Sequence, residues 1–274
     1  MKKYIIKAFT PISAVAAVFG LAGSAAHGQA VPVFEYDFPA SWNGTGTTIT
    51  DQSAGGNNGF YDGTLSLATA VPTGFPAGAQ SLNTTAGGIL TSGNSLLNNA
   101  SVFAGGGFIY NTWFMWNGTD STSFGHTQKL IDYAGTESLQ LITTAGSASL
   151  QMTFGDDTGA ETTPVSTTVL PNIWYHVRME FDATSFNAGD VSGTANLFLN
   201  GSLVGSGAAT KGTYGDSLAR PIGIGQLGAN FGYLVGFKGD IFDPSVSLVV
   251  PEPSVLALAT LGGLNFLLFR RRKA

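Results

Sequence analysis

The 274-residue sequence predicts an all-β fold, built as an antiparallel sandwich of two sheets. Short alternating or apolar segments recur through residues 31–250, and loops rich in Gly, Asn and Thr separate them, which is typical of strands joined by tight turns. No segment there shows the apolar period of an amphipathic helix of normal length. The 38 glycines and the 11% of charged residues also favour many short strands over helices.

The first half of this region contains four expected strands and one long loop. We expect strands at residues 33–38, 89–91, 108–116 and 129–133. Residues 108–116 (FIYNTWFMW) are the most apolar, so we place this strand at the centre of a sheet. Residues 42–63 are polar, with Gly and Asn at positions that permit turns and left-handed backbone.

The second half is expected to contain two hairpins and two closing strands. Residues 138–143 and 149–154 pair across 144–148, residues 195–199 and 202–204 pair across Asn200 and Gly201, and residues 222–225 and 236–242 close the sheets. The Asn-Gly pair is typical of a type I′ turn, because both central residues of that turn need a positive φ. Residues 174–182 alternate and predict a strand with two different faces. One face holds Tyr175, Val177, Met179 and Phe181, and the other holds His176, Arg178 and Glu180.

Two stretches of this region resemble laminin-G-like jelly rolls of the concanavalin A type. WYHVRMEFD…ANLFLNGSLVGSG, which begins at Trp174, looks like their W-x-H-V…L-Y-x-N-G hairpin region. GIGQLG…GYLVGFKGDIFD, which ends at Asp243, looks like their closing strand, and residues 51–59 approximate their D-x-S-G-x-x-N-x-G element. The order of these motifs implies one jelly-roll domain over residues 31–248, although residues 64–107 match none of them.

The first 30 residues predict a signal peptide. Three lysines within the first seven residues precede an apolar run at residues 8–21, and small residues follow at a suitable distance for cleavage. Cleavage after Gly28 or after Ala30 would start the mature chain between residues 29 and 31. The chain is therefore expected to be exported by the general secretion machinery.

Residues 249–274 form a second targeting segment. Pro251, Glu252 and Pro253 precede an apolar run at residues 255–269, and the basic cluster Arg270, Arg271 and Arg272 follows it. A helix over that run covers about 22 Å, less than the ~30 Å hydrocarbon core, so we expect a transient membrane tether with the arginines on the cytoplasmic side. The alternative is a buried core helix with a solvated basic end.

The order of triplet, apolar run and arginines resembles the PEP-CTERM sorting signal of exopolysaccharide-producing Gram-negative bacteria. The resemblance implies recognition by an exosortase, which is a membrane protease, and cleavage near the triplet. The protein would be exported across the inner membrane, held there transiently, and then transferred to the cell surface or released.

The region between the two targeting segments is strongly acidic and contains no cysteine. Residues 31–250 carry 5 Lys and Arg against 16 Asp and Glu, a net charge of −11. Such a body offers no basic patch to nucleic acid or to an anionic membrane. Without cysteine, the chain has no disulfides, thiolate metal sites or cysteine nucleophiles.

Calcium is the expected metal. Asp51 and Asn57 in the early loop, with Asp240 or Asp243 on the closing strand, would supply the hard oxygen ligands that Ca²⁺ requires. The resemblance to laminin-G-like sandwiches also implies such a site. The alternative is that Asp51 caps a turn and Asp240 binds loop backbone.

Aromatic side chains in loops are the expected glycan-binding residues. Trp42, Tyr61 and Tyr214 lie in predicted loops, where their rings could stack on sugar rings. Trp113 and Trp174 lie in predicted strands and are expected in the core.

The sequence contains no convincing catalytic set. Residues 180–182 (Glu-Phe-Asp) are the nearest match to the Glu, Asp, Glu strand of laminarinase-type glucanases, but no second Glu follows. The other acidic cluster, expected in a solvated turn, consists of Asp156, Asp157 and Glu161. His126 and His176 have no Ser or Asp partner in a known motif, and His176 is expected to be a packed strand residue.

We therefore expect an exported, exosortase-processed surface or matrix protein that binds extracellular polysaccharide or a surface glycoprotein without catalysis. Two alternatives stay open: a purely structural component of a biofilm matrix, and a glycan-active hydrolase with an unfamiliar site.

Overall fold

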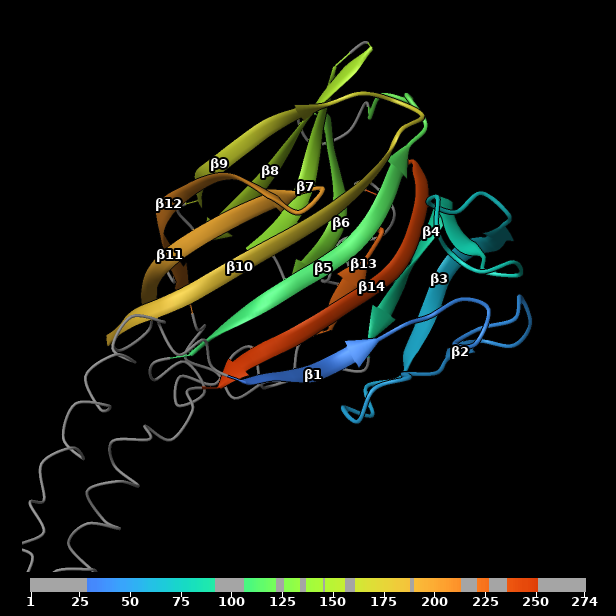
Figure 1. Cartoon of the computed structure of the whole chain (residues 1–274), viewed down its shortest axis with the longest axis horizontal. Helices are drawn as coiled ribbons and strands as arrows, with labels where there is room; N and C mark the ends of the chain where they lie inside the picture. The colour runs from blue at the N-terminus through green and yellow to red at the C-terminus, as the bar shows by residue number, and fades with distance from the viewer. Residues whose placement is uncertain are drawn as a thin grey trace, which may run out of the picture. The chain divides into compact units, whose positions relative to one another are not determined.

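The computed structural model describes residues 29–250, apart from 92–105, 122–125, 134–136, 145, 156–160, 188–189, 213–220 and 227–235. These residues belong to one compact unit that extends from Gly28 to Pro251. All 14 named elements of the described chain are β-strands (Figure 1). No described segment forms a helix with the length and hydropathy needed to cross a membrane.

The strands pair antiparallel, which confirms the all-β antiparallel prediction. In chain order the first seven are β1 (Gln29–Glu35), β2 (Thr48–Ile49), β3 (Gly59–Ala68), β4 (Ser81–Thr91), β5 (Gly107–Trp116), β6 (Thr127–Tyr133) and β7 (Glu137–Thr144). The remaining seven are β8 (Ser147–Gly155), β9 (Glu161–Val169), β10 (Trp174–Asn187), β11 (Asp190–Leu199), β12 (Ser202–Gly212), β13 (Ile222–Ile224) and β14 (Gly239–Val250).

The predicted two separate sheets are one continuous sheet that folds back on itself. Its strand order is β12-β11-β10-β5-β14-β4-β13-β6-β7-β8-β9, with β1 paired to β14 and the β2–β3 hairpin extending from β4. The three-residue strand β13 pairs with β4 on one side and β6 on the other, and so joins the two layers. The strands at the two ends of this order, β12 and β9, lie against each other. Gly207 of β12 is so close to Pro164 of β9 that a Cβ on Gly207 would lie 2.7 Å from the Cβ of Pro164.

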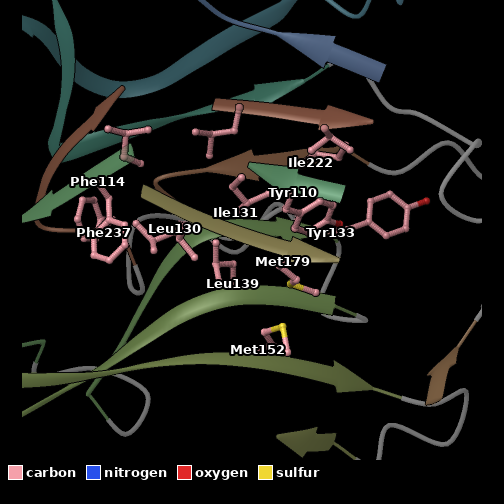
Figure 2. Packing of buried hydrophobic residues seen from close by; sticks show 14 of the residues in the cluster. Tyr110, Phe114, Leu130, Ile131, Tyr133, Leu139, Met152, Met179, Ile222 and Phe237 are labelled. Atoms are coloured by element: carbon pink, nitrogen blue, oxygen red, sulfur yellow. The ribbon is translucent and has the colours of Figure 1, made fainter. Parts of the chain in front are cut away.

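We call β1, β14, β5, β10, β11 and β12 the front layer and β6 to β9 the back layer; Figure 1 shows the front layer toward the viewer. The hydrophobic core lies between them. Phe108 of β5 and Phe154 of β8 both contact Phe181 of β10, with ring centroids 5.4 and 5.3 Å apart. Figure 2 shows the same interleaving for Met179 of the front layer and Met152 of the back layer. The inner faces of both layers are therefore buried against each other.

A buried ion pair also crosses the core. Lys211 of β12 and Glu137 of β7 have fully buried side chains, and Nζ lies 3.0 Å from Oε2. Tyr110 donates its hydroxyl to the other carboxylate oxygen at 3.1 Å, and Nζ lies 5.1 Å from the centre of the Tyr133 ring. Burial and the nearby Glu137 carboxylate raise the pKa of Tyr110 well above its usual range. The polar core residues are thus bound to one another, as low dielectric surroundings require.

Most of the predicted strands are confirmed. Residues 108–116 form β5, which lies between β10 and β14 in the front layer. The β11–β12 hairpin has the predicted type I′ turn, because φ is 51° at Asn200 and 80° at Gly201. The β7–β8 hairpin is also confirmed, with a tighter turn than predicted, since Thr144 pairs with Ser147.

Other strands differ from the prediction in extent. The first strand covers Gln29–Glu35 instead of residues 33–38, and β14 continues to Val250 instead of ending at residue 242. Residues 64–107, which match no family motif, contain most of the β3–β4 hairpin. Strand β9 was not predicted, and its first residue is Glu161, which we expected in a turn.

The two ends of the described domain meet. Gln29, the first residue of β1, pairs with Val250, the last residue of β14. The first four residues of β1 are exposed, while Val33 and Phe34 are buried in the core. The first and last strands of the described chain therefore begin and end as paired neighbours.

Candidate functional site

The outer face of the front layer carries aromatic, polar and charged side chains that are partly exposed. Strand β10 shows the predicted alternation: Val177, Met179 and Phe181 are buried, whereas His176 and Arg178 are half-buried on the opposite side. Because successive side chains of a strand point to opposite faces, the packed core fixes which residues face outward.

An aromatic row crosses this outer face. The register aligns His176 of β10 with Trp113 of β5, and Trp113 with Phe242 of β14. The Trp113 ring lies 4.8 Å from the His176 ring and meets Phe75 edge-on at 5.9 Å. Phe75, from the loop between β3 and β4, also packs on Phe242 at 4.5 Å and stays 37% exposed.

Trp113 was expected in the core, and this prediction is wrong. Trp113 is half-buried on the outer face, and the buried tryptophan of β5 is Trp116, whose indole nitrogen donates to the Thr119 carbonyl at 3.0 Å. Trp174, also expected in the core, is half-buried at the start of β10. For Trp113 the cause is the phase of the alternation, since odd positions of β5 face outward; Trp174 shares the outward-facing even positions of β10 with His176 and Arg178.

A polar row lies one step along the same face. Arg178 aligns with Asn111 of β5, and Asn111 with Ser245 of β14. Asn111 accepts a 2.8 Å hydrogen bond from Nε2 of His176, so this nitrogen carries the imidazole proton. The Arg178 guanidinium lies 4.2 Å from the centre of the Phe198 ring, and its Nε forms a 3.1 Å ion pair with Oε1 of Glu180.

A β-bulge in β14 keeps these rows in phase. The register with β5 shifts between Phe242 and Ser245, so that both residues lie on the outer face while Ile241 and Val246 stay buried. Asp243, inside the bulge, has a φ of 52°, a conformation that Asp adopts more readily than most residues. Without the extra residue, every side chain of β14 beyond the bulge would change face.

We call Phe75, Asn111, Trp113, His176, Arg178 and Glu180 the outer-face cluster. Burial and the nearby Arg178 charge lower the pKa of His176, so its imidazole is neutral at pH 7. The cluster thus combines aromatic surface, neutral donors and acceptors, and one charge-balanced ion pair. Such a surface can hold a polar, uncharged ligand by packing and hydrogen bonds.

Two of the aromatic residues predicted to bind glycan from loops, Trp42 and Tyr61, pack against the core instead of forming an exposed surface. Trp42 is only 6% exposed, donates its indole N–H to the Gly46 carbonyl at 3.2 Å, and packs on Tyr61 at 5.6 Å. The Trp42 ring belongs to the core, which corrects the prediction that it forms a stacking surface. Tyr61 is half-buried against it, and Tyr214 lies outside the described residues.

The predicted calcium ligands are each engaged by protein groups. The Asp51 carboxylate accepts backbone N–H bonds from Glu35, Ser53 and Asn57 at 2.8–2.9 Å, which is the turn-capping alternative. Asn57 donates its side-chain amide to the Val33 carbonyl at 2.6 Å. These bonds fasten the early loop to β1.

The third predicted ligand, Asp240, lies near the start of β14. Its Oδ1 accepts a 2.8 Å hydrogen bond from Asn83, and burial raises its pKa. Within the described part of the chain, no three His, Cys, Asp or Glu side chains are grouped as metal ligands. The Asp51 carboxylate and the Asn57 side-chain N–H groups hold the early loop, and Oδ1 of Asp240 binds Asn83, so calcium binding by these residues stays a prediction.

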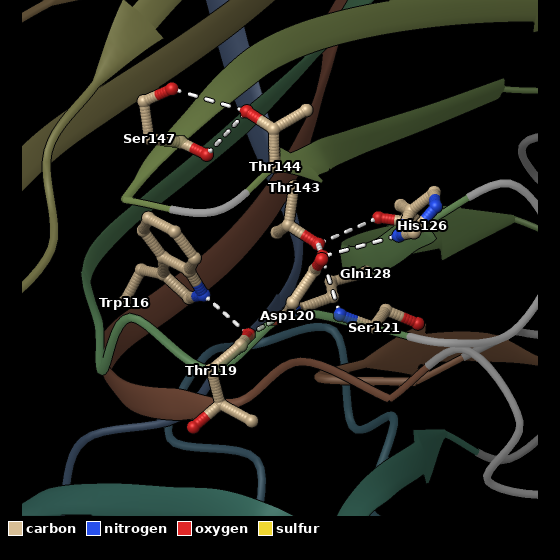
Figure 3. Close-up of polar contacts among 9 residues, drawn as sticks. All are labelled: Trp116, Thr119, Asp120, Ser121, His126, Gln128, Thr143, Thr144 and Ser147. Carbon is tan, nitrogen blue, oxygen red and sulfur yellow. Dashed lines mark hydrogen bonds and ion pairs between the residues drawn. The ribbon is translucent and has the colours of Figure 1, made fainter.

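His126 has an acidic partner that the sequence motifs did not reveal. Its Nδ1 lies 3.3 Å from Oδ1 of Asp120, and the same oxygen accepts the Thr143 hydroxyl at 2.5 Å (Figure 3). Ser121 donates its backbone N–H to Thr143 at 3.0 Å. Because the Thr143 hydroxyl faces the carboxylate and the His126 carbonyl instead of the imidazole, this group anchors a loop and lacks the geometry of a nucleophile and base.

The remaining predicted site residues divide into two groups. Glu180 and Asp182 share the outer face, where Glu180 pairs with Arg178 and Asp182 accepts a 3.1 Å hydrogen bond from Asn196. Residues outside the described part of the chain are Asp156, Asp157, Pro251, Glu252, Pro253, Arg270, Arg271 and Arg272.

No protein-family model and no curated protein matches the sequence. Among solved structures, the chain is similar to the binding domain of botulinum neurotoxin serotype D/C, at 13% identity and a TM-score of 0.47, covering 84% of this chain and 51% of that chain. It is similar to the binding domain of Paraclostridial Mosquitocidal Protein 1, at 14% identity and a TM-score of 0.46, with the same coverage of 84% and 51%. The chain spans about half the length of these structures, and TM-scores below 0.5 define no shared family or ligand.

Proposed function

We propose that this chain is an exported, exosortase-processed surface protein whose jelly-roll domain binds extracellular polysaccharide or a surface glycoprotein without catalysis. The observation that carries the proposal is the outer-face cluster, which presents rings and hydrogen-bonding groups on strands fixed by a packed core. A rigid, partly exposed surface of this kind lowers the entropy cost of binding.

The ends of the domain support the processing part of the proposal. Pairing of Gln29 with Val250 places the last residue of the folded sheet immediately before the Pro-Glu-Pro triplet. Cleavage at or beyond the triplet would leave β14 whole, and removal of residues 1–28 would leave β1 whole. Both cleavages can therefore spare the core.

The positions of the laminin-G-like motifs support the jelly-roll part. The first motif stretch falls on β10, β11 and β12 of the front layer, and the second runs from β13, which joins the two layers, to the beginning of β14 in the front layer. Strand β5 alone separates β14 from β10 in that layer.

The test is to produce the full chain in an exosortase-carrying Gram-negative host and to analyse the released form. We expect an N-terminus at residues 29–31, a C-terminus near the triplet, and retarded migration in native gels that contain the host's exopolysaccharide. Changing Pro251 and Pro253 together to Ala should retain the protein in the membrane fraction. Normal release of that variant would contradict exosortase processing, and unretarded migration in every polysaccharide would favour a structural matrix role.

A further inference from the structure

We infer that the outer-face cluster is a binding site for a neutral pyranose unit of a polysaccharide, with Trp113 and Phe75 packing on the sugar ring and Arg178, Glu180 and Asn111 binding its hydroxyls. This inference rests on the proposed function and narrows it to one surface and one ligand class.

The aromatic part of the cluster is held in place before any ligand arrives. Trp113 is flanked by a tilted contact with His176 and an edge-on contact with Phe75, and Phe75 itself packs on Phe242. Rings fixed in this way lose little rotamer freedom on binding. The C–H face of a pyranose is apolar, so it can pack on such rings as other apolar groups do.

The polar part lies at the right distance for the same sugar. Arg178 and Asn111 stand two residues along their strands from His176 and Trp113, a step of about 6.6 Å at about 3.3 Å per residue. Glu180 stands one further step along β10. A ring on Trp113 would therefore bring its hydroxyls to side chains that offer both donors and acceptors.

The charges of the cluster favour an uncharged ligand. The guanidinium of Arg178 is balanced by Glu180 at 3.1 Å, and His176 is neutral. Asp182 adds an acidic group on the same face, and residues 31–250 carry a net charge of −11. A uronate or sulfated sugar would be repelled by this field, whereas a neutral hexose would not.

The site is distinct from the loops that the sequence suggested. Trp42 is a core residue, and its nearest aromatic partner is Tyr61 of β3. Substitution of Trp42 would affect the fold, whereas Trp113 and Arg178 are partly solvent-exposed and can be changed with less effect on the core.

The experiment uses the released form of the full chain in native gels that contain dextran, galactomannan or alginate. Three variants are compared with it: Trp113→Ala, Arg178→Gln, and Phe60→Ala as a matched aromatic control. Phe60 is 48% exposed on β3, which is hydrogen-bonded to β2 and β4 and not to the strands of the cluster. Thermal unfolding of each variant verifies that it is folded.

We expect at least one of the two neutral polysaccharides to retard the protein, and Trp113→Ala to weaken that binding about tenfold or more. Arg178→Gln should weaken it as well, and Phe60→Ala should not. Binding of alginate alone, or binding that folded Trp113→Ala and Arg178→Gln both retain, would overturn the inference and leave polysaccharide binding intact. Absence of retardation by all three probes and by the host's own exopolysaccharide would overturn polysaccharide binding altogether, and with it both the inference and that part of the proposed function.

Discussion

The two faces of strand β10 carry residues of opposite kinds within one or two positions of each other. Met179 and Phe181 are fully buried, while Arg178, which lies between the buried Val177 and Met179, has a side chain that is 42% exposed. The inner face is closed by contacts with the back layer, and the outer face has no layer of the described chain over it. One strand therefore stabilises the fold with its inner side chains and can bind a ligand with its outer ones.

Two of the ion pairs in the described chain, one buried and one partly exposed, show the same division. Lys211 and Glu137 are fully buried and joined by Tyr110, whereas Arg178 and Glu180 are partly exposed to solvent. Removing one partner of a buried pair leaves an uncompensated charge in low dielectric surroundings, while a solvent-exposed pair contributes little to stability. Substitutions in the buried pair should therefore lower stability, whereas substitutions in the Arg178–Glu180 pair should change glycan binding with little effect on stability.

The largest expected effect is that of Lys211→Met. We expect it to lower the free energy of unfolding by about 3–5 kcal/mol, because the buried Glu137 carboxylate loses the opposite charge of Lys211. Urea denaturation of the released protein measures the loss. The double variant with Glu137→Leu should recover most of it, since a well-packed apolar pair replaces two buried charges. A loss of less than about 1 kcal/mol in the single variant would show that the buried pair contributes no more to stability than an exposed one.

The neighbouring residues Met179 and Arg178 give the next test. Met179→Ala should cost about 2–5 kcal/mol by opening a cavity in the core, without changing glycan affinity. Arg178→Ala should cost about 1 kcal/mol or less and weaken glycan binding. Denaturant midpoints and gel retardation measured on both variants check the pair, and equal stability losses would refute the assignment of roles to the two faces.

Sequence patterns predicted the parts of the fold that depend on local spacing. The alternation of β10 and the type I′ turn at Asn200 and Gly201 need only neighbouring residues, and both are confirmed. Strand β9 was missed because just two of its nine residues, Val165 and Val169, are buried. Its place is fixed by pairing with β8 and by contact with β12, which no local pattern encodes.

The candidate site was only partly predictable for the same reason. The alternation placed His176, Arg178 and Glu180 on one face, but not beside Trp113. That neighbourhood depends on the register between β5 and β10 and on the bulge in β14. Trp42 shows the opposite case, since a polar surrounding sequence suggested exposure and the early loop folds it into the core.

The bulge that aligns the outer face should also affect the pH dependence of stability. Burial, followed by repulsion from Glu35 and Asp37, raises the pKa of Asp243 to about 6. The folded state therefore holds this proton more tightly than the unfolded state, whose pKa is near 3.9, and stability should fall as pH rises from about 4 to 6. Asp243→Asn should raise Tm at pH 7 and not at pH 4, because Asn also tolerates the positive φ.

The control for this prediction is Glu161→Gln, an exposed carboxylate at the start of β9. It should leave the difference in Tm between pH 4 and pH 7 unchanged. If Asp243→Asn also leaves that difference unchanged, or lowers Tm at pH 7, the bulge carboxylate is not a source of the pH dependence.

The smallest expected effect concerns His176, which is partly buried although it lies on the outer face of β10. Its pKa is lowered first by burial and then by Arg178, so between the unfolded value of about 6.5 and the lower folded value the unfolded state binds more protons. Stability should therefore decrease as pH falls below about 6.5. NMR titration of the imidazole should give a midpoint below that value, and Arg178→Gln should raise the midpoint without restoring it fully, because burial remains. A midpoint at or above the unfolded value would mean that the imidazole is more solvated than its contacts with Trp113 and Asn111 require, and the outer-face cluster would then not be preorganised as a binding surface.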